Sequence, residues 1–239
     1  MTYVIADVHG DYEKYRRMLE TIALSEQDTL YVLGDVVDRG PEPIKILQDM
    51  MARPNVMPIL GNHEFMAAYC LKRLLVEITD ESIANLDAGT FQGLQNWFEN
   101  GGQTTLRQFH ALPQEERRDV LDFLCDFSLY EEVTVGGRDY LLVHAGLENF
   151  SPDRPLEDYE PYEMLFSRPD YERPYFPDKI VVTGHTSTRS IPGNPRPGRI
   201  FKGNNHIAID CGCGYGGLLG AICLDTGEEF YVVDGAEEA

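Results

Sequence analysis

Close to its N-terminus the chain contains Tyr3-Val4-Ile5-Ala6-Asp7-Val8-His9-Gly10, an apolar run that ends in an acid and a histidine. Two further runs follow the same plan. Residues 29–33 lead into Gly34-Asp35-Val36-Val37-Asp38-Arg39-Gly40, and residues 56–60 lead into Gly61-Asn62-His63-Glu64. Asp35 lies 28 residues after Asp7, and Asn62 lies 27 residues after Asp35, close to the roughly 30-residue length of a strand-helix-strand unit. The repeat predicts an α/β fold.

Two later apolar runs end in histidines. Residues 140–143 are followed by His144-Ala145-Gly146, and residues 180–183 by Gly184-His185-Thr186. The five runs are β-branched and do not alternate, which is typical of strands buried on both faces. We therefore expect the five polar clusters to fall on one edge of the sheet, beyond the carboxyl ends of its strands. Ligands bind at that edge in open α/β sheets.

Helical patterns separate the first three runs. Apolar residues recur at helical spacing over residues 12–22 and 44–51, and Pro43 precedes the second stretch, a favoured residue at a helix start. Residues 65–127 also have mostly helical periodicity, broken at Gly101-Gly102 and at Pro113. Because no linker-like tract sets this stretch apart, we expect a helical insert or cap within a single domain that spans residues 1–239.

The rest of the chain predicts hairpins and one long loop. A hairpin turns at Gly136-Gly137, and a loop rich in tyrosine and proline covers residues 151–177. From His206 onward we expect antiparallel strands, with Asp225-Thr226-Gly227 turning the last hairpin.

Charge and composition narrow the classes of function. Among 239 residues, Lys and Arg total 20 against 40 Asp and Glu, a net charge of −20, opposite to the field of a general nucleic-acid binder. The N-terminus does not resemble a signal peptide, and the longest weakly charged stretch contains Asp210 and several glycines. The five cysteines are irregularly spaced, as is typical of reduced thiols. We expect a cytoplasmic protein without a membrane or extended nucleic-acid partner, and the sequence leaves its oligomeric state open.

The polar clusters supply oxygen and nitrogen donors without a thiolate. This mixture suits Mn²⁺, Fe or Zn²⁺, and Mn²⁺ is the metal we expect. One tetrahedral ion needs fewer donors than are present, and Asp35 lies between the two sets. The sequence therefore predicts two divalent ions, which lower the pKa of a bridging water and hold the oxygens of a displacement at phosphorus. The candidate donors are Asp7, His9, Asp35, Asn62, His144 and His185.

Three neighbouring residues suit the handling of a phosphate ester. Arg39 can bind a phosphate group with two parallel hydrogen bonds. His63 can protonate a leaving alkoxide, and Asp38 can fix the tautomer and orientation of that imidazole.

The three N-terminal clusters resemble, in order, the signature blocks of the calcineurin-like metallophosphoesterase superfamily, in particular its phosphoprotein phosphatase branch. The sequence is most similar there to small bacterial and phage serine/threonine protein phosphatases. The resemblance covers residues 5 to about 212 and includes Asn100-Gly101-Gly102. It implies a four-layer sandwich of two mixed β-sheets flanked by helices.

The resemblance also implies a role for each site residue. It assigns Asp7, His9 and Asp35 to one metal ion, and Asp35, Asn62, His144 and His185 to the other. Arg39, Asn62 and Arg168 would contact the phosphate, and His63 with Asp38 would supply the acid. Arg168 is transferred by its position in a variable loop and not by a motif. After Asp210 the relatives often have Thr-Gly, whereas this chain has Cys211-Gly212.

The resulting hypothesis is a metal-dependent phosphomonoester hydrolase, a protein serine/threonine phosphatase acting on a phosphorylated protein or peptide, or on a small phosphoester. The alternative is a symmetrical dinucleoside tetraphosphate hydrolase. Those enzymes usually have Ala at the position of Asp38 and Asp at the position of Glu64, so the residues here favour the phosphatase branch. A non-catalytic scaffold with the phosphatase fold is a third hypothesis, and the filled ligand positions argue against it.

Other patterns have plainer interpretations. We interpret His110 as a packing residue, and His206 belongs to no motif. Gly212, Gly214 and Gly217 match a dinucleotide fingerprint, but a strand pattern follows them, and Cys211 with Cys213 lacks the second cysteine pair of a zinc site. Two features stay open. The first is the basic stretch 189–202, a solvated loop or an attractor of anionic substrate. The second is a set of tyrosines that line a substrate groove or anchor their loop: Tyr159, Tyr162, Tyr171 and Tyr175.

Overall fold

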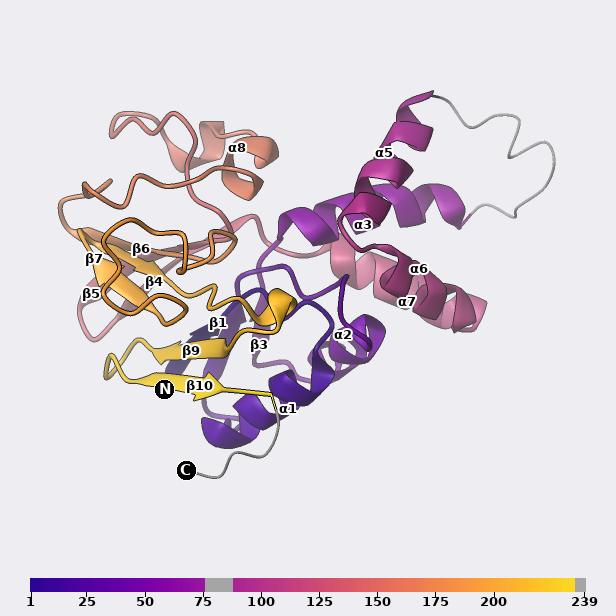
Figure 1. Ribbon diagram of the computed structural model, residues 1–239, viewed down its shortest axis with the longest axis horizontal. Coiled ribbons are helices and arrows are strands. Elements are labelled where there is room, and N and C mark those ends of the chain that lie inside the picture. Colours follow the sequence, from indigo (N-terminus) through magenta and orange to yellow (C-terminus); the bar gives the residue numbers. More distant parts are fainter. Residues whose placement is uncertain (76–87, 235–239) are drawn as a thin grey trace.

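The computed structural model describes residues 1–75 and 88–234, and two five-stranded mixed sheets form its centre (Figure 1). In the first sheet, the parallel strands β1 (Thr2–Ile5), β2 (Thr29–Val32) and β3 (Val56–Pro58) lie side by side. Strand β9 (Leu219–Cys223) pairs antiparallel with β1, and β10 (Glu229–Val232) pairs antiparallel with β9. The hairpin predicted at residues 225–227 is confirmed.

The second sheet has the order β4-β5-β6-β8-β7. Strands β4 (Tyr130–Val135) and β5 (Arg138–Val143) form the hairpin expected at Gly136-Gly137. Strand β6 (Lys179–Thr183) runs parallel to β5 and to β8 (His206–Ala208), while β7 (Phe201–Gly203) pairs antiparallel with β8. Both sheets are therefore mixed, as the resemblance implies.

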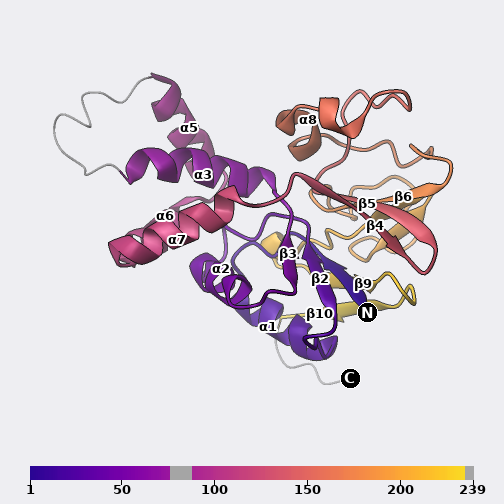
Figure 2. The same cartoon turned by 180° about the vertical axis from the view of Figure 1, so that it is seen from behind.

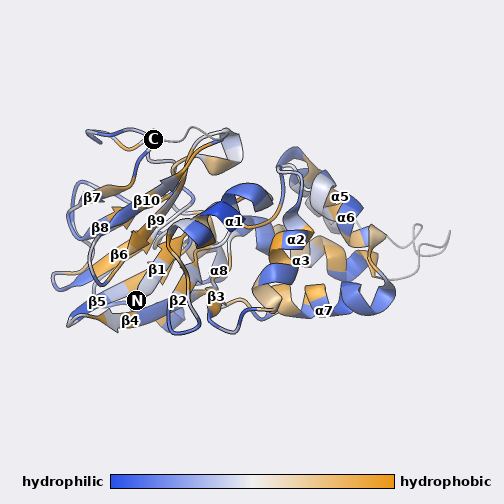
Figure 3. Ribbon diagram, turned by 90° about the horizontal axis from the view of Figure 1, so that it is seen from below, coloured by the Kyte–Doolittle hydropathy of each residue, from blue (hydrophilic) through white to orange (hydrophobic). Residues whose placement is uncertain are grey.

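Alternate side chains of each strand fill different layers. Val4 and Leu33 pack with Leu142 and Val182 between the two sheets, whereas Ile5 faces the helices on the other side of the first sheet. That outer layer contains α1 (Tyr12–Thr21) and α2 (Pro43–Met51). The outer face of the second sheet packs on the 151–177 stretch, which holds two short helices, η1 (Leu156–Asp158) and α8 (Pro161–Leu165). Figure 3 shows orange in the central strands, around β1 and β6, and more blue in the edge strands and outer segments. The four-layer fold is confirmed.

Four helices form a separate lobe beside α2. They are α3 (Asn62–Leu74), α5 (Ala88–Glu99), α6 (Gln103–Ala111) and α7 (Gln114–Cys125). Figure 2 shows them stacked on one another at the side of the first sheet. The breaks predicted at Gly101-Gly102 and Pro113 fall between α5, α6 and α7. Helix α3 begins at Asn62, earlier than the expected residue 65, and residues 76–87 of the predicted insert lie outside the described residues. The single domain stays a prediction.

The expectation that all five clusters end strands of one sheet is wrong. Asp7, Asp35 and Asn62 follow strands of the first sheet, whereas His144 and His185 follow β5 and β6 of the second. An apolar run looks the same in either sheet, because both sheets bury strands on two faces. The clusters still meet, since the two sheets are stacked and these five strands end on the same side of the stack. Within the described residues, no helix is long and apolar enough to span a membrane.

Candidate active site

Strained backbone marks the point where the strands end. Among the described residues other than glycine, ten have a positive φ, and six of those ten belong to the predicted site. They are Asp7, His9, Asp35, Asp38, Arg39 and His185, with φ between 48° and 71°. A non-glycine residue in this region costs of order 1–3 kcal/mol, and such strain concentrates at functional sites. All of these residues except Asp38 line one cavity, so the strained positions gather at the predicted site.

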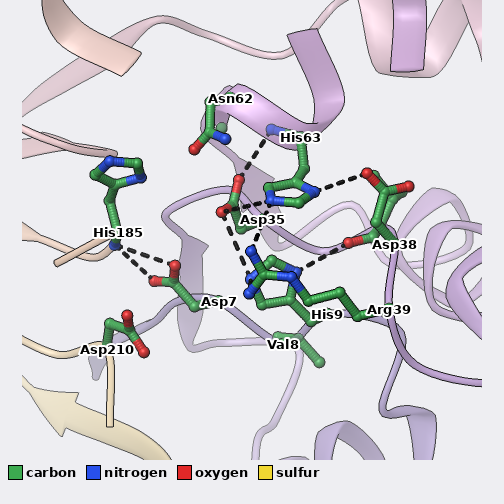
Figure 4. A network of polar contacts seen from close by, with 12 residues as sticks. Asp7, Val8, His9, Asp35, Asp38, Arg39, Asn62, His63, His185 and Asp210 are labelled. Atoms are coloured by element: carbon green, nitrogen blue, oxygen red, sulfur yellow. Dashed lines mark hydrogen bonds and ion pairs between the residues drawn. The ribbon is translucent and has the colours of Figure 1, made fainter. Parts of the chain in front are cut away.

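Asp35 lies between two groups of imidazoles (Figure 4). Its Oδ2 is 3.6 Å from His9 Nε2 and 3.8 Å from His63 Nε2. Its Oδ1 is 3.4 Å from His144 Nε2, and His185 completes that second group. Each carboxylate oxygen therefore faces a different set of nitrogen atoms, which is the arrangement a bridging ligand needs.

Backbone carbonyls fix the tautomers of two of these histidines. His9 Nδ1 lies 3.2 Å from the carbonyl oxygen of Val37, and His144 Nδ1 lies 2.7 Å from that of Leu33. Because a carbonyl only accepts hydrogen bonds, each Nδ1 carries the proton and each Nε2 presents a lone pair. Metal-binding histidines are oriented in the same way.

Electrostatics favour a cation at this point. Burial lowers the pKa of His9 to about 3 and also lowers the pKa of His144, so both rings are neutral at pH 7. Neutral His144 Nε2 then faces two oxygens, Asp35 Oδ1 at 3.4 Å and Asn62 Oδ1 at 2.9 Å. Three electron-rich atoms that converge in this way form a site that a positive ion would stabilise. The donor set, carboxylate, amide and imidazole without thiolate, fits Mn²⁺, Fe or Zn²⁺.

The contacts of Asp7 differ in detail from those predicted. Its two oxygens accept hydrogen bonds from the backbone N–H of His185, at 3.1 and 3.0 Å, and His63, not Asp7, completes the first group with His9 and Asp35. Asp7 still lines the same cavity of about 170 Å³. Burial and the nearby Asp210 carboxylate raise its pKa, and Figure 4 shows these two acids side by side.

Arg39 extends across the cavity toward the imidazoles. Its Nη1 lies 2.9 Å from His9 Nε2 and its Nη2 lies 3.1 Å from His63 Nε2. The guanidinium also lies 4.4 Å from the ring centroid of Tyr215. Arg168, in the loop between α8 and β6, lines the same cavity and contacts Thr186 Oγ1 at 3.4 Å. Two cations that bind phosphate well thus face one cavity.

His63 and Asp38 form a buried pair. His63 Nδ1 lies 2.7 Å from Asp38 Oδ2, and neither residue is more than 1% exposed. Although burial opposes it, the carboxylates of Asp35 and Asp38 raise the pKa of His63. The arrangement is the one expected of a proton donor whose ring is held by a carboxylate.

Sequence reasoning missed four residues that line the cavity: Asn100, Asp210, Gly214 and Tyr215. Burial and the Asp35 carboxylate raise the pKa of Asp210 to about 6. The available signal was the one that identified Asp7, because Asp210 also follows a buried apolar run, Ile207-Ala208-Ile209. Asn100 belongs to a motif that was noted but given no role. Nothing in the pattern around Tyr215 indicates the site.

The structure also places the residues that have plainer interpretations, and of these Gly214 lines the cavity. His206 is buried, and its Nε2 lies 3.1 Å from the Arg173 carbonyl oxygen. The strand β9 that follows the glycine-rich turn confirms that it is no dinucleotide fingerprint. In the basic stretch, Arg196 and Lys202 form ion pairs with Glu229, which favours a structural loop.

The tyrosines of the long loop have different surroundings. Tyr159 and Tyr171 are buried and anchor the loop, whereas Tyr162 is 62% exposed. Tyr175 lines a second cavity that also contains Arg168.

Comparison with known families identifies the class of protein. Residues 2–212 match the model of the calcineurin-like phosphoesterase family. The chain belongs to this family and is a hydrolase of the metallophosphoesterase type. Its members use two metal ions, and the groups around Asp35 form a cluster able to hold them.

Several similar proteins are named symmetrical bis(5'-nucleosyl)-tetraphosphatases. The protein from Delftia acidovorans is 34% identical over 175 residues, 68% of this chain and 62% of its own length. That from Dechloromonas aromatica is 27% identical over 271 residues and covers 97% of this chain and 95% of its own. The match to the Acidovorax ebreus protein, 31% identical over 150 residues, covers 61% of this chain and only 43% of that protein.

Solved structures share the fold. A candidate diadenosine tetraphosphatase superposes with a TM-score of 0.64 at 20% identity, covering 97% of this chain and 92% of that one. A protein serine/threonine phosphatase from Saccharomyces cerevisiae superposes with a TM-score of 0.56 at 14% identity, covering 99% and 81%. At such identities the likeness concerns the fold alone.

Proposed function

We propose that this chain hydrolyses symmetrical dinucleoside tetraphosphates with the help of two divalent cations. The observation that carries the hydrolytic part is the position of Asp35, which presents one oxygen to His9 and the other to His144. His9, Asp35 and Asp7 would hold one ion, and Asp35, Asn62, His144 and His185 the other. When bound, such a pair lowers the pKa of a coordinated water and neutralises charge on the phosphoryl oxygens.

Two arginine side chains of the chain bind and orient the phosphate. Arg39 reaches the cavity from the loop between β2 and α2, and Arg168 from the loop between α8 and β6, so both can contact phosphoryl oxygens there. The two ions must share this space with Arg39, whose guanidinium meets His9 and His63 directly. We expect it to swing toward the substrate phosphate when the cations bind. His63, oriented by Asp38, holds the proton for the leaving oxygen.

Two observations support a dinucleotide substrate. The similar proteins from Delftia and Dechloromonas are named for that activity. A second cavity of about 410 Å³ shares Arg168 with the first and is lined by Phe150, Phe166, Tyr175 and Arg173. Aromatic rings and a further guanidinium suit the base and phosphates of a departing nucleotide. A substrate with two nucleotide halves needs room of this kind beyond the point of cleavage.

The second candidate is a protein serine/threonine phosphatase, and the pair His63–Asp38 favours it. A serine alkoxide is a poor leaving group that must gain a proton, so an oriented acid matters most for that substrate. A nucleoside diphosphate leaves more easily. Glu64, where the tetraphosphatases usually have Asp, also favours the protein phosphatase.

A substrate panel tests the proposal. The protein, dialysed against chelator and reloaded with Mn²⁺, is given diadenosine tetraphosphate and phosphoserine, phosphothreonine and phosphotyrosine peptides. We expect the highest kcat/KM for diadenosine tetraphosphate, with two molecules of ADP as products. A higher value for a phosphopeptide would replace the first candidate by a protein phosphatase. No turnover of any substrate with Mn²⁺, Fe²⁺ or Zn²⁺ would contradict the enzyme assignment and favour the scaffold.

A further inference from the structure

The helical lobe reaches into the active site at Asp38. Trp97, on α5, donates from Nε1 to Asp38 Oδ2 at 2.9 Å, and Thr105, on α6, donates from Oγ1 to Asp38 Oδ1 at 2.6 Å. Asp38, Trp97 and Thr105 are all fully buried. Together with His63 Nδ1, these donors satisfy both oxygens of a carboxylate that is completely removed from water, where an unpaired charge is very costly.

The same lobe holds the backbone at this point. Asp38 and Arg39 have φ values of 71° and 65°, and two consecutive non-glycine residues keep this conformation only when the surroundings fix it. The N–H of Asp38 donates to Thr105 Oγ1 at 3.0 Å, and the N–H of Arg39 donates to the Gly101 carbonyl at 3.1 Å. Both strained residues therefore have their N–H groups bound by the lobe.

The motif Asn100-Gly101-Gly102 makes this approach possible. A Cβ at Gly101, whose φ is 96°, would lie 2.9 Å from Arg39 Cγ, and a Cβ at Gly102 would lie 2.5 Å from Trp97 Cε2. Neither position has room for a side chain. The two glycines let the turn between α5 and α6 lie directly against Arg39 and Trp97.

We propose that Trp97 and Thr105 are positioning residues for the His63–Asp38 pair, so that the helical lobe sets the orientation of the acid. The inference rests on the proposed function, in which His63 protonates the leaving oxygen. A carboxylate with fixed oxygens holds the imidazole in one orientation, with Nδ1–H toward Asp38 and Nε2 toward the substrate. Without the two donors Asp38 can turn, and His63 loses its orientation while the metal-binding residues stay in place.

The kinetic test removes one donor at a time, with a nearly isosteric substitution at Thr105 and a smaller aromatic ring at Trp97. Trp97→Phe removes the indole N–H, and Thr105→Val removes the hydroxyl; Thr105→Ser is the matched control, because it keeps the hydroxyl and removes the methyl group. With phenyl phosphate, whose leaving group needs a proton, we expect the first two variants to lose about 10-fold in kcat, a part of the 10²–10⁴-fold that acid catalysis supplies. With p-nitrophenyl phosphate the loss should be about 2-fold or less, and Thr105→Ser should resemble the unchanged protein.

Two further measurements distinguish a positioning role from a general loss of structure. In an Asp38→Asn background, Trp97→Phe should cause no additional loss, because its only route to the acid has been removed. In metal-free protein with ¹⁵N-labelled histidine, the Nδ1–H resonance of His63, assigned by its disappearance in His63→Asn, should shift in Trp97→Phe and Thr105→Val but not in Thr105→Ser.

The outcomes distinguish the two proposals. Three results would each overturn the positioning role. The first is an equal loss in kcat on both aryl phosphates, and the second is a loss from Trp97→Phe that is as large in the Asp38→Asn background as in the unchanged protein. The third is a His63 resonance that does not shift. If Trp97→Phe fails to fold, the comparison of Thr105→Val with Thr105→Ser tests the proposal by itself. If the unchanged protein hydrolyses no phosphoester, the proposed function fails, and the resonance still reports whether the lobe orients His63.

Discussion

The carboxylate of Glu64 accepts a hydrogen bond from the backbone N–H of Asp35 at 2.7 Å. The same carboxylate accepts from the N–H groups of Val36, Val37 and Gly61, at 2.8, 3.0 and 3.1 Å. Glu64 is fully buried in the first turn of α3. One side chain therefore ties the loop of Asp35, the proposed shared ligand, to the helix that begins with Asn62.

Glu64→Gln should destabilise the protein strongly. An amide NH₂ would face backbone donors, and a buried donor left without an acceptor costs about 1–3 kcal/mol. We expect the free energy of unfolding in urea to fall by at least about 2 kcal/mol. The control is Glu42→Gln, whose ion pair with Lys45 is exposed and contributes less than about 1 kcal/mol. Superimposable unfolding curves for Glu64→Gln and the unchanged protein would refute this role.

Asp35→Asn should lose more metal than Asp7→Asn. Asp35 faces both groups of imidazoles, whereas Asp7 lies beside only one side of the site. An amide cannot offer two anionic oxygens, so the affinity for both ions should fall. Elemental analysis after dialysis against the same Mn²⁺ concentration measures this difference. If Asp35→Asn retained as many ions per chain as Asp7→Asn, Asp35 would not be the shared ligand.

A pH dependence of stability should arise at Glu163. Arg154 donates two hydrogen bonds to its carboxylate, at 2.8 and 2.6 Å, and lowers the pKa of Glu163 from 4.5 to about 2. A lowered pKa in the folded state stabilises the protein above the unfolded value, and this contribution disappears as the pH falls from about 4.5 toward 2.

Glu163→Gln should therefore lower the melting temperature at pH 6 and have progressively less effect toward pH 2.5. Glu157→Gln, an exposed position on the same loop, serves as the control. A melting-temperature difference that stays constant over this range would show that the ion pair does not carry the pH dependence.

Of the five cysteines, one should react readily with a thiol reagent. Cys125 is exposed, and the other four are buried. Burial also raises the pKa of Cys70 to about 11 and that of Cys213 to about 12, which lowers their thiolate fraction near pH 8. Titration of the folded protein with Ellman's reagent should show one fast thiol, absent in Cys125→Ser. A second thiol reacting at the same rate would contradict the buried positions.

Local patterns predicted much of this molecule. Apolar runs located the inner strands to within about two residues, and the polar residues directly after them include the groups that the structure brings together around Asp35. Which sheet each strand joins could not be read from those runs, since burial on two faces leaves the same pattern in both. The contacts of Asp38 with Trp97 and Thr105 span 59 and 67 residues. In sequence those two residues look like ordinary helix core.

The central claim is a two-cation site built around Asp35. It is tested most directly by anomalous diffraction from crystals soaked in Mn²⁺. We predict two anomalous peaks, one about 2.0–2.3 Å from His9 Nε2 and Asp35 Oδ2 and the other at similar distances from His144 Nε2 and Asp35 Oδ1. A single peak, or peaks that do not contact Asp35, would contradict the account.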